Sequence, residues 1–450
     1  MIKRLFTLFS PSKPDSAVVN NVKVIPRDEH IISRRSISPN ALKVMNRLNQ
    51  ANFQGYLVGG GVRDLLLGGS PKDFDVATDA TPEQVKTLFR NSRIIGRRFK
   101  IVHVRFGREI IEVTTFRGQN SDSNQQVESD TGQLLRDNVY GDMESDALRR
   151  DFTANALYYS AKDFSLYEYT SGLEDIENRQ LRMIGDPSTR YKEDPVRLLR
   201  AIRFAAKLGF QIEESTAEPI RTQAHLLGHV PAARLFEEIL KLFLGGYATA
   251  TYGLLKEYKL LDQLFPGSCK VIDQDPTYSK LIDEVMLSTD KRIRSDKRVT
   301  PAFIYAALLW PALHAEIAKL QDKGLSVLES FHQANQKITS QQLQRIMIPK
   351  RFLIPMKQIW ELQWRLPNRQ GKRAHRLLEH PKFRAGYDFM LLREAAGENL
   401  DELGQWWTQF QDANEDERES MVNQLNPKGN KNRRRRKPKK KKTNDNEGSE

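Results

Sequence analysis

The stretch LVGGGVRD at residues 57–64, followed by DFD at residues 73–75, decides how the amino-terminal part of the chain folds. Residues 56–58 form a short apolar run typical of a strand, the glycines permit a tight turn, and residues 62–67 have the apolar spacing of a helix. A strand that passes through glycines into a helix leaves backbone N–H groups unpaired at the helix start. Because such groups suit phosphate oxygens, the stretch predicts a turn that binds a phosphate chain.

The acids of the DFD stretch have the spacing of a cation site. Asp73 and Asp75 are two residues apart on a predicted strand, so both carboxylates point to one side while Phe74 faces the core. Like charges on one face repel, and Mg²⁺, which also binds substrate phosphates, stabilises such a pair. Glu112 interrupts an apolar strand, where an unpaired charge is costly, so we expect it to share the cation. Three carboxylates beside a triphosphate turn describe a two-metal site for displacement at phosphorus.

Each half of this pattern also has an ordinary structural interpretation. The glycines alone could form a tight turn, and an isolated Asp-x-Asp is often a capping or surface pair. The order and spacing of the two halves together favour the functional interpretation. A dinucleotide-binding fold would need Gly-x-Gly-x-x-Gly with an acid about 20 residues later. A P-loop would need Gly-Lys-Ser/Thr. Neither pattern occurs at this position.

The composition limits the class of protein. With 450 residues the chain is long enough for several domains, and 39% apolar residues suffice for buried cores. No run approaches the roughly 18 apolar residues that a membrane-spanning helix needs, so we expect no transmembrane segment. Cys269 is the only cysteine, which excludes a disulfide within the chain and a cysteine-based zinc site and suits a reducing cytoplasm.

Positive charge is concentrated at the carboxyl end. The formal net charge is +14, and eleven basic residues without an acid lie between residues 428 and 442. Because a charge block of this kind cannot fold alone, residues 426–450 are expected to be a disordered basic tail. The tail either keeps the protein in solution or binds nucleic-acid phosphates, and the clustering of its charges favours the second role.

The periodicity along the chain predicts an α+β protein, with a small mixed sheet and its helices followed by an all-helical remainder. We expect an irregular leader (1–35), a head (36–185) with a mobile polar loop (118–133), a helical neck that binds nucleotide and RNA (186–265), a helical body that binds RNA (266–425) and the basic tail (426–450). In the head the pattern predicts a helix begun by Ser38 and Pro39, helices over 62–67 and 82–89, strands over 74–77, 101–106 and 109–116, and a further strand pair over 166–169 and 181–184. Later helices are expected over 198–208, 235–244, 252–261, 301–320 and 353–366.

Two further motifs complete an ordered set. They are RRDFTANAL at residues 149–157 and EDPVRLLR at residues 193–200. With the glycine turn and the DFD stretch, they resemble the class II nucleotidyltransferases of the polymerase β superfamily, which comprise bacterial poly(A) polymerases and CCA-adding tRNA nucleotidyltransferases. The resemblance covers roughly residues 40–265, and its one departure is Ala154 in place of a larger aliphatic residue. It implies a polymerase β-like nucleotidyltransferase head.

The resemblance also implies roles for individual residues. Asp73 and Asp75 correspond to the metal-binding catalytic pair, and Asp151 to a further acidic residue of the active site. Arg150 corresponds to a residue that touches the nucleotide. The triphosphate-binding turn corresponds to Gly59, Gly60 and Arg63, of which the arginine can grip phosphate oxygens with its fork of donors.

The EDPVRLLR motif is implied to select the base. Asp194 and Arg197 resemble the pair that recognises the Watson–Crick edge of the incoming nucleotide in place of a template. Asp194 followed by a proline predicts a helix cap, so both side chains project from the first turn. A capping aspartate with a surface arginine is the ordinary alternative. Arg200 and Arg203 continue this side, where they either meet RNA phosphates or form a solvated face.

Three segments resemble those of bacterial poly(A) polymerases more than those of the tRNA enzymes, namely residues 94–101, residues 138–141 and the basic tail. The first hypothesis is therefore a template-independent adenylyltransferase that adds AMP from ATP to RNA 3′ ends with Mg²⁺ or Mn²⁺, as a cytoplasmic monomer. The second is a CCA-adding enzyme, and the third is an RNA-binding protein whose transferase site has decayed. The intact pair of Asp73 and Asp75 argues against the third hypothesis.

Overall fold

The computed structural model describes residues 18–19, 22–96, 100–118, 126–128, 134–137 and 139–425. The chain divides into two compact units. Unit 1 comprises Met1–Lys270, Met286–Val299 and Gln336–Ile348, and unit 2 comprises Val271–Val285, Thr300–Asn335 and Pro349–Glu450. The predicted basic tail, the first 17 residues of the predicted leader and most of the predicted loop at 118–133 lie outside the described residues.

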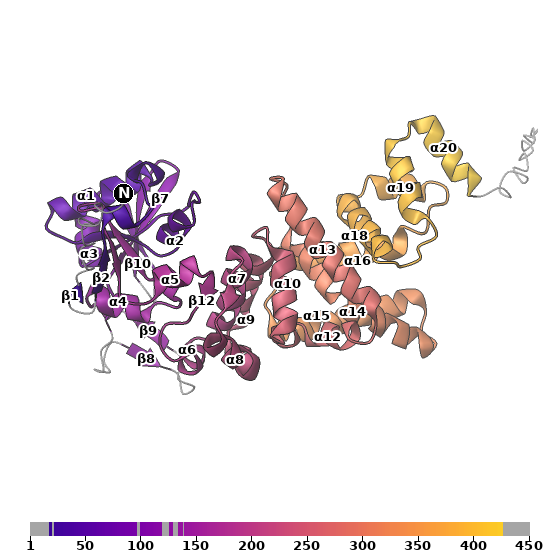
Figure 1. Cartoon of the computed structure of the whole chain (residues 1–450). Coiled ribbons are helices and arrows are strands. Elements are labelled where there is room, and N and C mark those ends of the chain that lie inside the picture. Colours follow the sequence, from indigo (N-terminus) through magenta and orange to yellow (C-terminus); the bar gives the residue numbers. More distant parts are fainter. Residues whose placement is uncertain are drawn as a thin grey trace, which may run out of the picture. The chain divides into compact units, whose positions relative to one another are not determined.

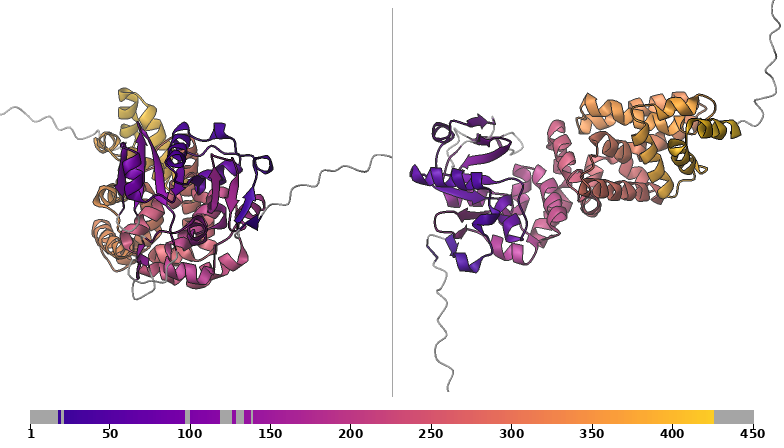
Figure 2. Two further views of the ribbon diagram at one scale, coloured as in Figure 1. Left: turned by 90° about the vertical axis from the view of Figure 1, so that its left-hand side faces the viewer. Right: turned by 90° about the horizontal axis from the view of Figure 1, so that it is seen from above.

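A nine-stranded mixed sheet forms the centre of unit 1. In spatial order its strands are β1 (Val18–Val19), β2 (Val22–Ile25), β11 (Leu166–Glu168), β10 (Leu157–Ser160), β3 (Gly55–Val58), β4 (Asp75–Thr78), β7 (Glu109–Thr115), β6 (Ile101–Phe106) and β5 (Ser92–Ile95). Most neighbours are antiparallel, but β4 and β7 run parallel. Figures 1 and 2 show that this sheet belongs to the indigo-to-magenta part of the chain and that the later part is helical. The structure confirms the predicted α+β class.

The helices α1 (Pro39–Gln50) and α3 (Pro82–Leu88) begin where the sequence predicts them. The Ser38 side chain accepts from the Asn40 backbone N–H at 3.1 Å and a proline occupies the first turn of α1. Thr81 begins α3 with a reciprocal capping box to Gln84. The two helices contact each other and strands of the sheet. The opposite face carries a core that includes Val58, Ala77, Phe116, Ala147 and Tyr158.

The strands confirm one predicted hairpin and correct three other expectations. Residues 101–106 and 109–115 pair as an antiparallel hairpin, as predicted. The segments near 166 and 181 do not pair with each other, because β11 joins the main sheet while β12 (Gln180–Leu181) pairs with β13 (Gln211–Ile212). Within the predicted irregular leader, β2 instead forms a sheet strand beside β11. Within the predicted loop lies β8 (Gln126–Glu128), which pairs with β9 (Leu134–Asp137) just beyond the end of that loop.

The remainder is helical, as predicted. Its helices are α4 (Met143–Arg149), α5 (Gly172–Glu177), α6 (Pro187–Glu193), α7 (Val196–Leu208), α8 (Glu214–Gln223), α9 (Ala232–Phe243), α10 (Ala248–Glu257), α11 (Leu260–Leu264), α12 (Pro266–Ile272), α13 (Pro276–Arg294), α14 (Pro301–Asp322), α15 (Val327–Arg345), α16 (Lys350–Arg365), α17 (Arg373–Leu378), α18 (Phe383–Ala395), α19 (Leu403–Asp412) and α20 (Glu415–Gln424). The helix predicted over 252–261 is divided into α10 and α11, because Lys259 between them has a left-handed backbone.

Helix α14 is long and apolar enough to meet the length and composition criteria for a membrane span, the only such helix among the described residues. The sequence analysis did not anticipate this. In the structure 67% of its most apolar window is buried inside the protein. The helix contacts α16 and α18, and the Trp360 indole N–H donates to the Ala306 carbonyl at 2.9 Å. These contacts are those of a core helix.

Candidate active site

The glycine turn lies beside the first residue of β4. Because β3 and β4 are antiparallel with Val58 opposite Asp75, the turn that follows Val58 meets the acid directly. Gly59 has φ +74°, a left-handed conformation that favours glycine. A Cβ atom at this position would lie 3.8 Å from Asp75 Oδ2 and 3.6 Å from Arg150 Nη1. The structure therefore brings the predicted turn, acid and nucleotide-contacting arginine together.

The structure confirms that Phe74 is buried between the two acids of the DFD stretch, but it does not place Asp73 on the strand. Phe74 is buried, whereas Asp73 is exposed and Asp75 is half-buried. Strand β4 begins at Asp75, so Asp73 precedes the strand instead of lying on it as predicted. A Cβ atom on Gly61 would lie 3.5 Å from the Asp73 carbonyl oxygen. Both acids are thus adjacent to α2 (Gly60–Leu66), which follows the turn.

The charge of Asp75 is incompletely compensated. Burial, the negative charge of Glu112 and, more weakly, that of Asp73 raise its pKa to about 6, although Arg150 opposes the shift. An acid whose ionised form is disfavoured to this extent gains most from a nearby cation. The site thus has the electrostatics that a divalent cation would relieve.

Glu112 lies opposite Asp75 in the parallel pair of β4 and β7. The prediction rested on an unpaired buried charge, and that premise is wrong. The Glu112 side chain is 44% exposed and its Oε1 lies 3.2 Å from His103 Nε2 on the neighbouring strand. Among the described residues no three His, Cys, Asp or Glu side chains are grouped to hold an ion. A metal role for Glu112 remains a prediction.

Arg150 is held by two partners on the same face of the sheet. Its Nε donates to the Tyr158 hydroxyl at 3.1 Å and its Nη2 donates to Asp146 at 2.9 Å. The Tyr158 hydroxyl in turn donates to Asp146 at 2.7 Å. These bonds fix the guanidinium with its Nη1 beside Gly59. The arrangement leaves that nitrogen directed at the space where a triphosphate is predicted.

Arg63 is placed differently from the prediction of a phosphate-gripping residue. Its side chain is only 2% exposed. Its guanidinium donates to Asp64 through Nε and Nη2, at 2.9 and 2.6 Å, and to the Asn155 side-chain oxygen at 2.5 Å. Nη2 lies 3.3 Å from where a Cβ of Gly60 would be. The buried Arg63 side chain therefore packs against the glycine turn. Its contact with phosphate stays a prediction.

Asp151 belongs to the same internal network. Its carboxylate accepts from the Phe152 backbone N–H at 2.9 Å, from Asn155 at 3.1 Å and from Arg200 Nε at 2.8 Å. Burial alone would raise the pKa of Asp151, but Arg200 and Asn155 outweigh it and lower the pKa to about 2. Asp151 thus holds Arg200 of α7 against the head. The Arg200 side chain is 33% exposed and already paired within the protein, so neither of the two roles predicted for it is tested.

The comparisons with known proteins match most of the chain. Residues 55–182 match the Poly A polymerase head domain, residues 209–271 the probable RNA and SrmB-binding site of polymerase A, and residues 323–441 the polymerase A arginine-rich C-terminus. The chain is 50% identical to Poly(A) polymerase I of Escherichia coli O6:H1, over 92% of this chain and 91% of that protein. The chain belongs to the poly(A) polymerase I family.

A second relative supports the same family, and a solved structure supports the fold. Poly(A) polymerase I of Haemophilus influenzae is 44% identical over 91% of this chain and 93% of its own length. A structure of the Thermotoga maritima CCA-adding enzyme with a tRNA has a TM-score of 0.56, at 17% identity, and covers 84% of each chain. The chain therefore shares its fold with that CCA-adding enzyme.

In this family member the predicted base-recognition residues are held separately. Asp194 ends α6 and α7 begins at Val196, one residue later than a cap at Asp194 predicts. Both Asp194 carboxylate oxygens accept from Arg234 of α9, each at 2.8 Å. Arg197 donates to Glu193 at 2.8 Å. Each residue of the predicted pair is therefore positioned by a different partner.

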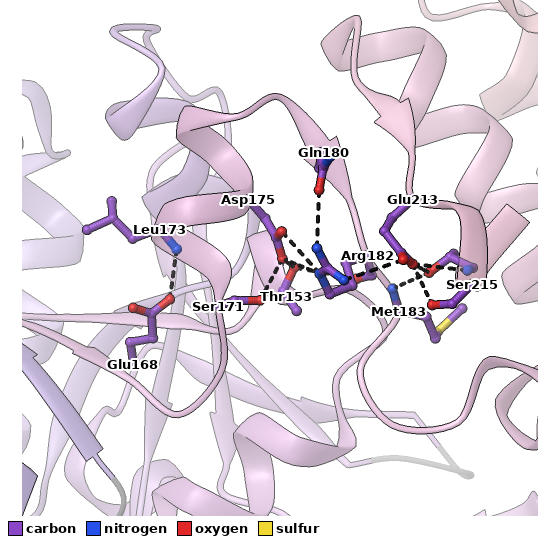
Figure 3. A network of polar contacts seen from close by, with 11 residues as sticks. Thr153, Glu168, Ser171, Leu173, Asp175, Gln180, Arg182, Met183, Glu213 and Ser215 are labelled. Carbon is purple, nitrogen blue, oxygen red and sulfur yellow. Dashed lines mark hydrogen bonds and ion pairs between the residues drawn. The ribbon is translucent and has the colours of Figure 1, made fainter.

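Figure 3 shows how the segment that follows Asp151 is braced. Asp175 is 2% exposed and accepts from Thr153 at 2.7 Å and from Arg182 at 3.1 Å. Arg182 Nη1 also lies 3.5 Å from Glu213 at the start of α8. The network links 3-10 helix η3 (Thr153–Asn155) to later helices of unit 1. The same 3-10 helix contains Asn155, whose side-chain oxygen accepts from Arg63 Nη1.

Three positioning residues were not assigned by the sequence analysis. Asn155 and Tyr158 lie in or next to the quoted RRDFTANAL stretch, so their proximity to Asp151 was a signal that could have been used. Arg234 lies 40 residues from Asp194 in an amphipathic helix. Nothing in its local sequence distinguishes it from a surface arginine.

Proposed function

We propose that the chain is a template-independent polynucleotide adenylyltransferase, which adds AMP from ATP to RNA 3′-hydroxyl ends and releases pyrophosphate. Its membership of the poly(A) polymerase I family supports this activity over most of the chain. The observation that carries the proposal is the convergence of the Gly59 turn, the Asp75 carboxylate and Arg150 Nη1.

The triphosphate of ATP binds at the glycine turn in this proposal. Gly59 has no side chain that could cap α2, so the first amides of the helix face the site without a side-chain acceptor. Arg150 supplies a fixed positive charge beside them. The oxygen of the RNA 3′-hydroxyl forms a bond to the α-phosphorus, the bond to the bridging oxygen breaks, and pyrophosphate leaves while the hydroxyl proton passes to solvent.

Asp73 and Asp75 are the residues that would hold a divalent cation, Mg²⁺ or Mn²⁺. Such an ion, when bound, stabilises charge at the reacting phosphate and favours deprotonation of the attacking hydroxyl. Mg²⁺ is often bound by one or two carboxylates together with substrate phosphates, and so a complete protein cage is not required. This agrees with the absence of a three-ligand cluster among the described residues. The raised pKa of Asp75 supports the assignment.

Adenine is selected by Asp194 and Arg197 in this proposal. A carboxylate accepts from the adenine amino group and a guanidinium donates to a ring nitrogen. The bidentate pair with Arg234 fixes the Asp194 carboxylate before the nucleotide arrives. Selection by protein side chains makes a nucleic-acid template unnecessary.

We further propose that the protein acts in the cytoplasm as a monomer. The partners are RNA 3′ ends and ATP. The basic residues between 428 and 442, which lie outside the described residues, contribute salt-dependent contacts to RNA phosphates.

One assay tests the activity and its main alternative. Purified protein is supplied with Mg²⁺, a generic RNA or a tRNA lacking its terminal nucleotides, and each nucleoside triphosphate in turn. We expect long ladders with ATP alone on either RNA. Extension that requires CTP and stops after three nucleotides on tRNA would identify a CCA-adding enzyme, and no extension would identify a binding protein.

A pair of variants tests the cation site within the same assay. Asp73→Ala is expected to abolish extension while RNA binding survives, because the carboxylate holds the cation and contributes little to RNA affinity. Asp28→Ala serves as the control, since Asp28 is exposed in 3-10 helix η1 (Arg27–Glu29). Normal extension by Asp73→Ala would contradict the assignment.

A further inference from the structure

Unit 2 carries a strongly basic pocket that the proposed reaction does not use. The pocket has a volume of about 400 Å³. It lies where α16 ends and α17 begins, and its lining comprises Arg365, Asn368, Arg373, Arg376 and Leu377. Among the residues that the structure describes, no carboxylate lines it. The segment from residue 365 to residue 376 contains four arginines and a lysine without an acid.

The cations of this pocket are available to a ligand. Arg373 and Arg376 are exposed, and within the described part of the chain their side chains make no hydrogen bond or ion pair. Arg365 has a partner in Glu361 at 3.2 Å, but both side chains are about half exposed, so the pair is weak. Converging guanidinium groups without carboxylates suit phosphate oxygens.

Two residues that neighbour the pocket lining in the chain contact a row of aromatic side chains. Arg369, next to Asn368 in the chain, lies over the Trp406 ring with its guanidinium carbon 5.0 Å from the centroid. Trp406 stacks on Phe410 at 4.7 Å. His375, which precedes Arg376 in the chain, contacts Phe410, and the centroids of the two rings are 5.3 Å apart. Trp406 is only half-buried, so part of its ring reaches solvent.

The pocket is built on a rigid support. α16, α17, α18 and α19 contribute to one hydrophobic core, which includes Leu366, Leu377, Tyr387 and Trp407. The Trp407 indole N–H donates to the Leu366 carbonyl at 3.1 Å, which fixes α19 beside the end of α16. Figure 1 shows these helices in the orange-to-yellow part of the chain. The arginines and Trp406 are therefore presented by packed helices.

We propose that this pocket and Trp406 bind single-stranded RNA, with phosphates on Arg373 and Arg376 and a base that takes the place of the Arg369 guanidinium over the Trp406 ring. The inference rests on the proposed function, because RNA is the substrate that the protein must hold while its 3′ end reacts. Proteins that bind single-stranded nucleic acids without strong sequence preference combine a basic groove with aromatic side chains on which bases stack. An acidic protein segment would use the arginines but would have no need of the aromatic face.

The first test removes the two exposed charges in the full-length protein. The double variant Arg373→Gln, Arg376→Gln is compared with Lys319→Gln, Lys323→Gln, which removes two exposed charges elsewhere in unit 2. Binding to a long single-stranded RNA is measured against salt concentration. We expect the arginine variant to bind about tenfold more weakly at low salt and the salt slope to fall by about 1.4, or 0.7 per lost phosphate contact. The lysine control should match the parent protein.

The second test addresses the aromatic contact. Trp406→Ala is expected to weaken binding of the same RNA at least fivefold, the loss of one stacked base, while Trp406→Phe retains most of it. Equal binding by Trp406→Ala and the parent would overturn the aromatic part of the site. Thermal unfolding of all variants shows whether the core beneath Trp406 is intact.

Extension of a primer of a few nucleotides separates this inference from the proposed function. On a saturating short primer with ATP, the arginine variant should keep the kcat of the parent, whereas its KM for long RNA should rise about tenfold. Unchanged binding and KM for long RNA in an active arginine variant would overturn the inference and leave the proposed function standing. Loss of polyglutamate binding with RNA binding unchanged would instead make the pocket a protein site. No extension by the parent protein would refute the proposed function itself.

Discussion

Two aspartates of unit 1, Asp75 and Asp151, are withdrawn from solvent to a comparable degree and behave in opposite ways. The pKa of Asp75 rises to about 6, because burial is reinforced by Glu112 and Asp73. The pKa of Asp151 falls to about 2, because Arg200 and Asn155 outweigh the effect of burial. Burial is the first cause of a shift in both cases, and the neighbouring charges decide its sign.

The opposite pKa shifts distinguish a carboxylate that lacks enough positive charge around it from one whose charge is fully compensated by the protein. Around Asp75 the protein leaves negative charge that only Arg150 offsets, which is the condition in which an external cation gains most. Around Asp151 every oxygen has a protein partner. We therefore interpret Asp75 as a catalytic residue and Asp151 as a positioning residue that holds α7 against the head.

The largest effect is expected from Asp75→Asn. The change keeps the shape of the side chain but removes a ligand charge, so kcat for AMP addition should fall by about three orders of magnitude, the several kcal/mol that a bound metal contributes. Stability without divalent cations should stay the same or increase, because the variant relieves repulsion from Glu112. Extension assays and urea unfolding measure the two quantities.

A smaller effect, on stability, is expected from Asp151→Asn. An acid with a lowered pKa stabilises the folded state above its ordinary pKa, and this contribution disappears as the pH falls toward the lowered value. From the shift to about 2, the loss at pH 7 should be about 2 kcal/mol in the free energy of unfolding. The difference between variant and parent should shrink as the pH falls from about 4 toward 2. A difference that is independent of pH would contradict the assignment of the charge.

A third effect, on nucleotide selection, is expected from Arg234→Ala. Loss of the bidentate pair frees the Asp194 carboxylate to rotate. Because a hydrogen bond to a charged group contributes about 1.5 kcal/mol or more, KM for ATP should rise about tenfold. The preference for ATP over CTP should fall in parallel. Arg221→Ala is a matched control in the same unit, because the ion pairs of Arg221 are exposed and do not involve Asp194. An unchanged ATP preference would show that Arg234 has no part in selection.

Much of the fold followed from local chemistry. The helix start at Ser38 and Pro39 and the hairpin turn after Phe106 are both signalled within a few residues, and each is found where it was predicted. The glycine turn and the DFD stretch were expected to meet, and the antiparallel pair of β3 and β4 brings them together.

The corrections concern partners that lie far apart in the sequence. Strand β2 is too short to be recognised alone and is stabilised by pairing with β11, more than a hundred residues later. Glu112 was expected to be an unpaired buried charge, but His103 lies opposite it on β6. The sequence of β7 alone does not indicate this partner. Arg234 reaches Asp194 through tertiary packing of α9. Local patterns predict elements well but do not predict which charges will find partners.

The central claim is that Asp73 and Asp75 hold a divalent cation against a triphosphate at the glycine turn. The most direct measurement is the affinity for ATP with and without Mg²⁺, in the parent and in the double variant Asp73→Asn, Asp75→Asn. We predict that Mg²⁺ strengthens binding at least tenfold in the parent and has no effect in the variant, which should bind metal-free ATP at least as tightly as the parent does. Equal strengthening by Mg²⁺ in both proteins would contradict the account.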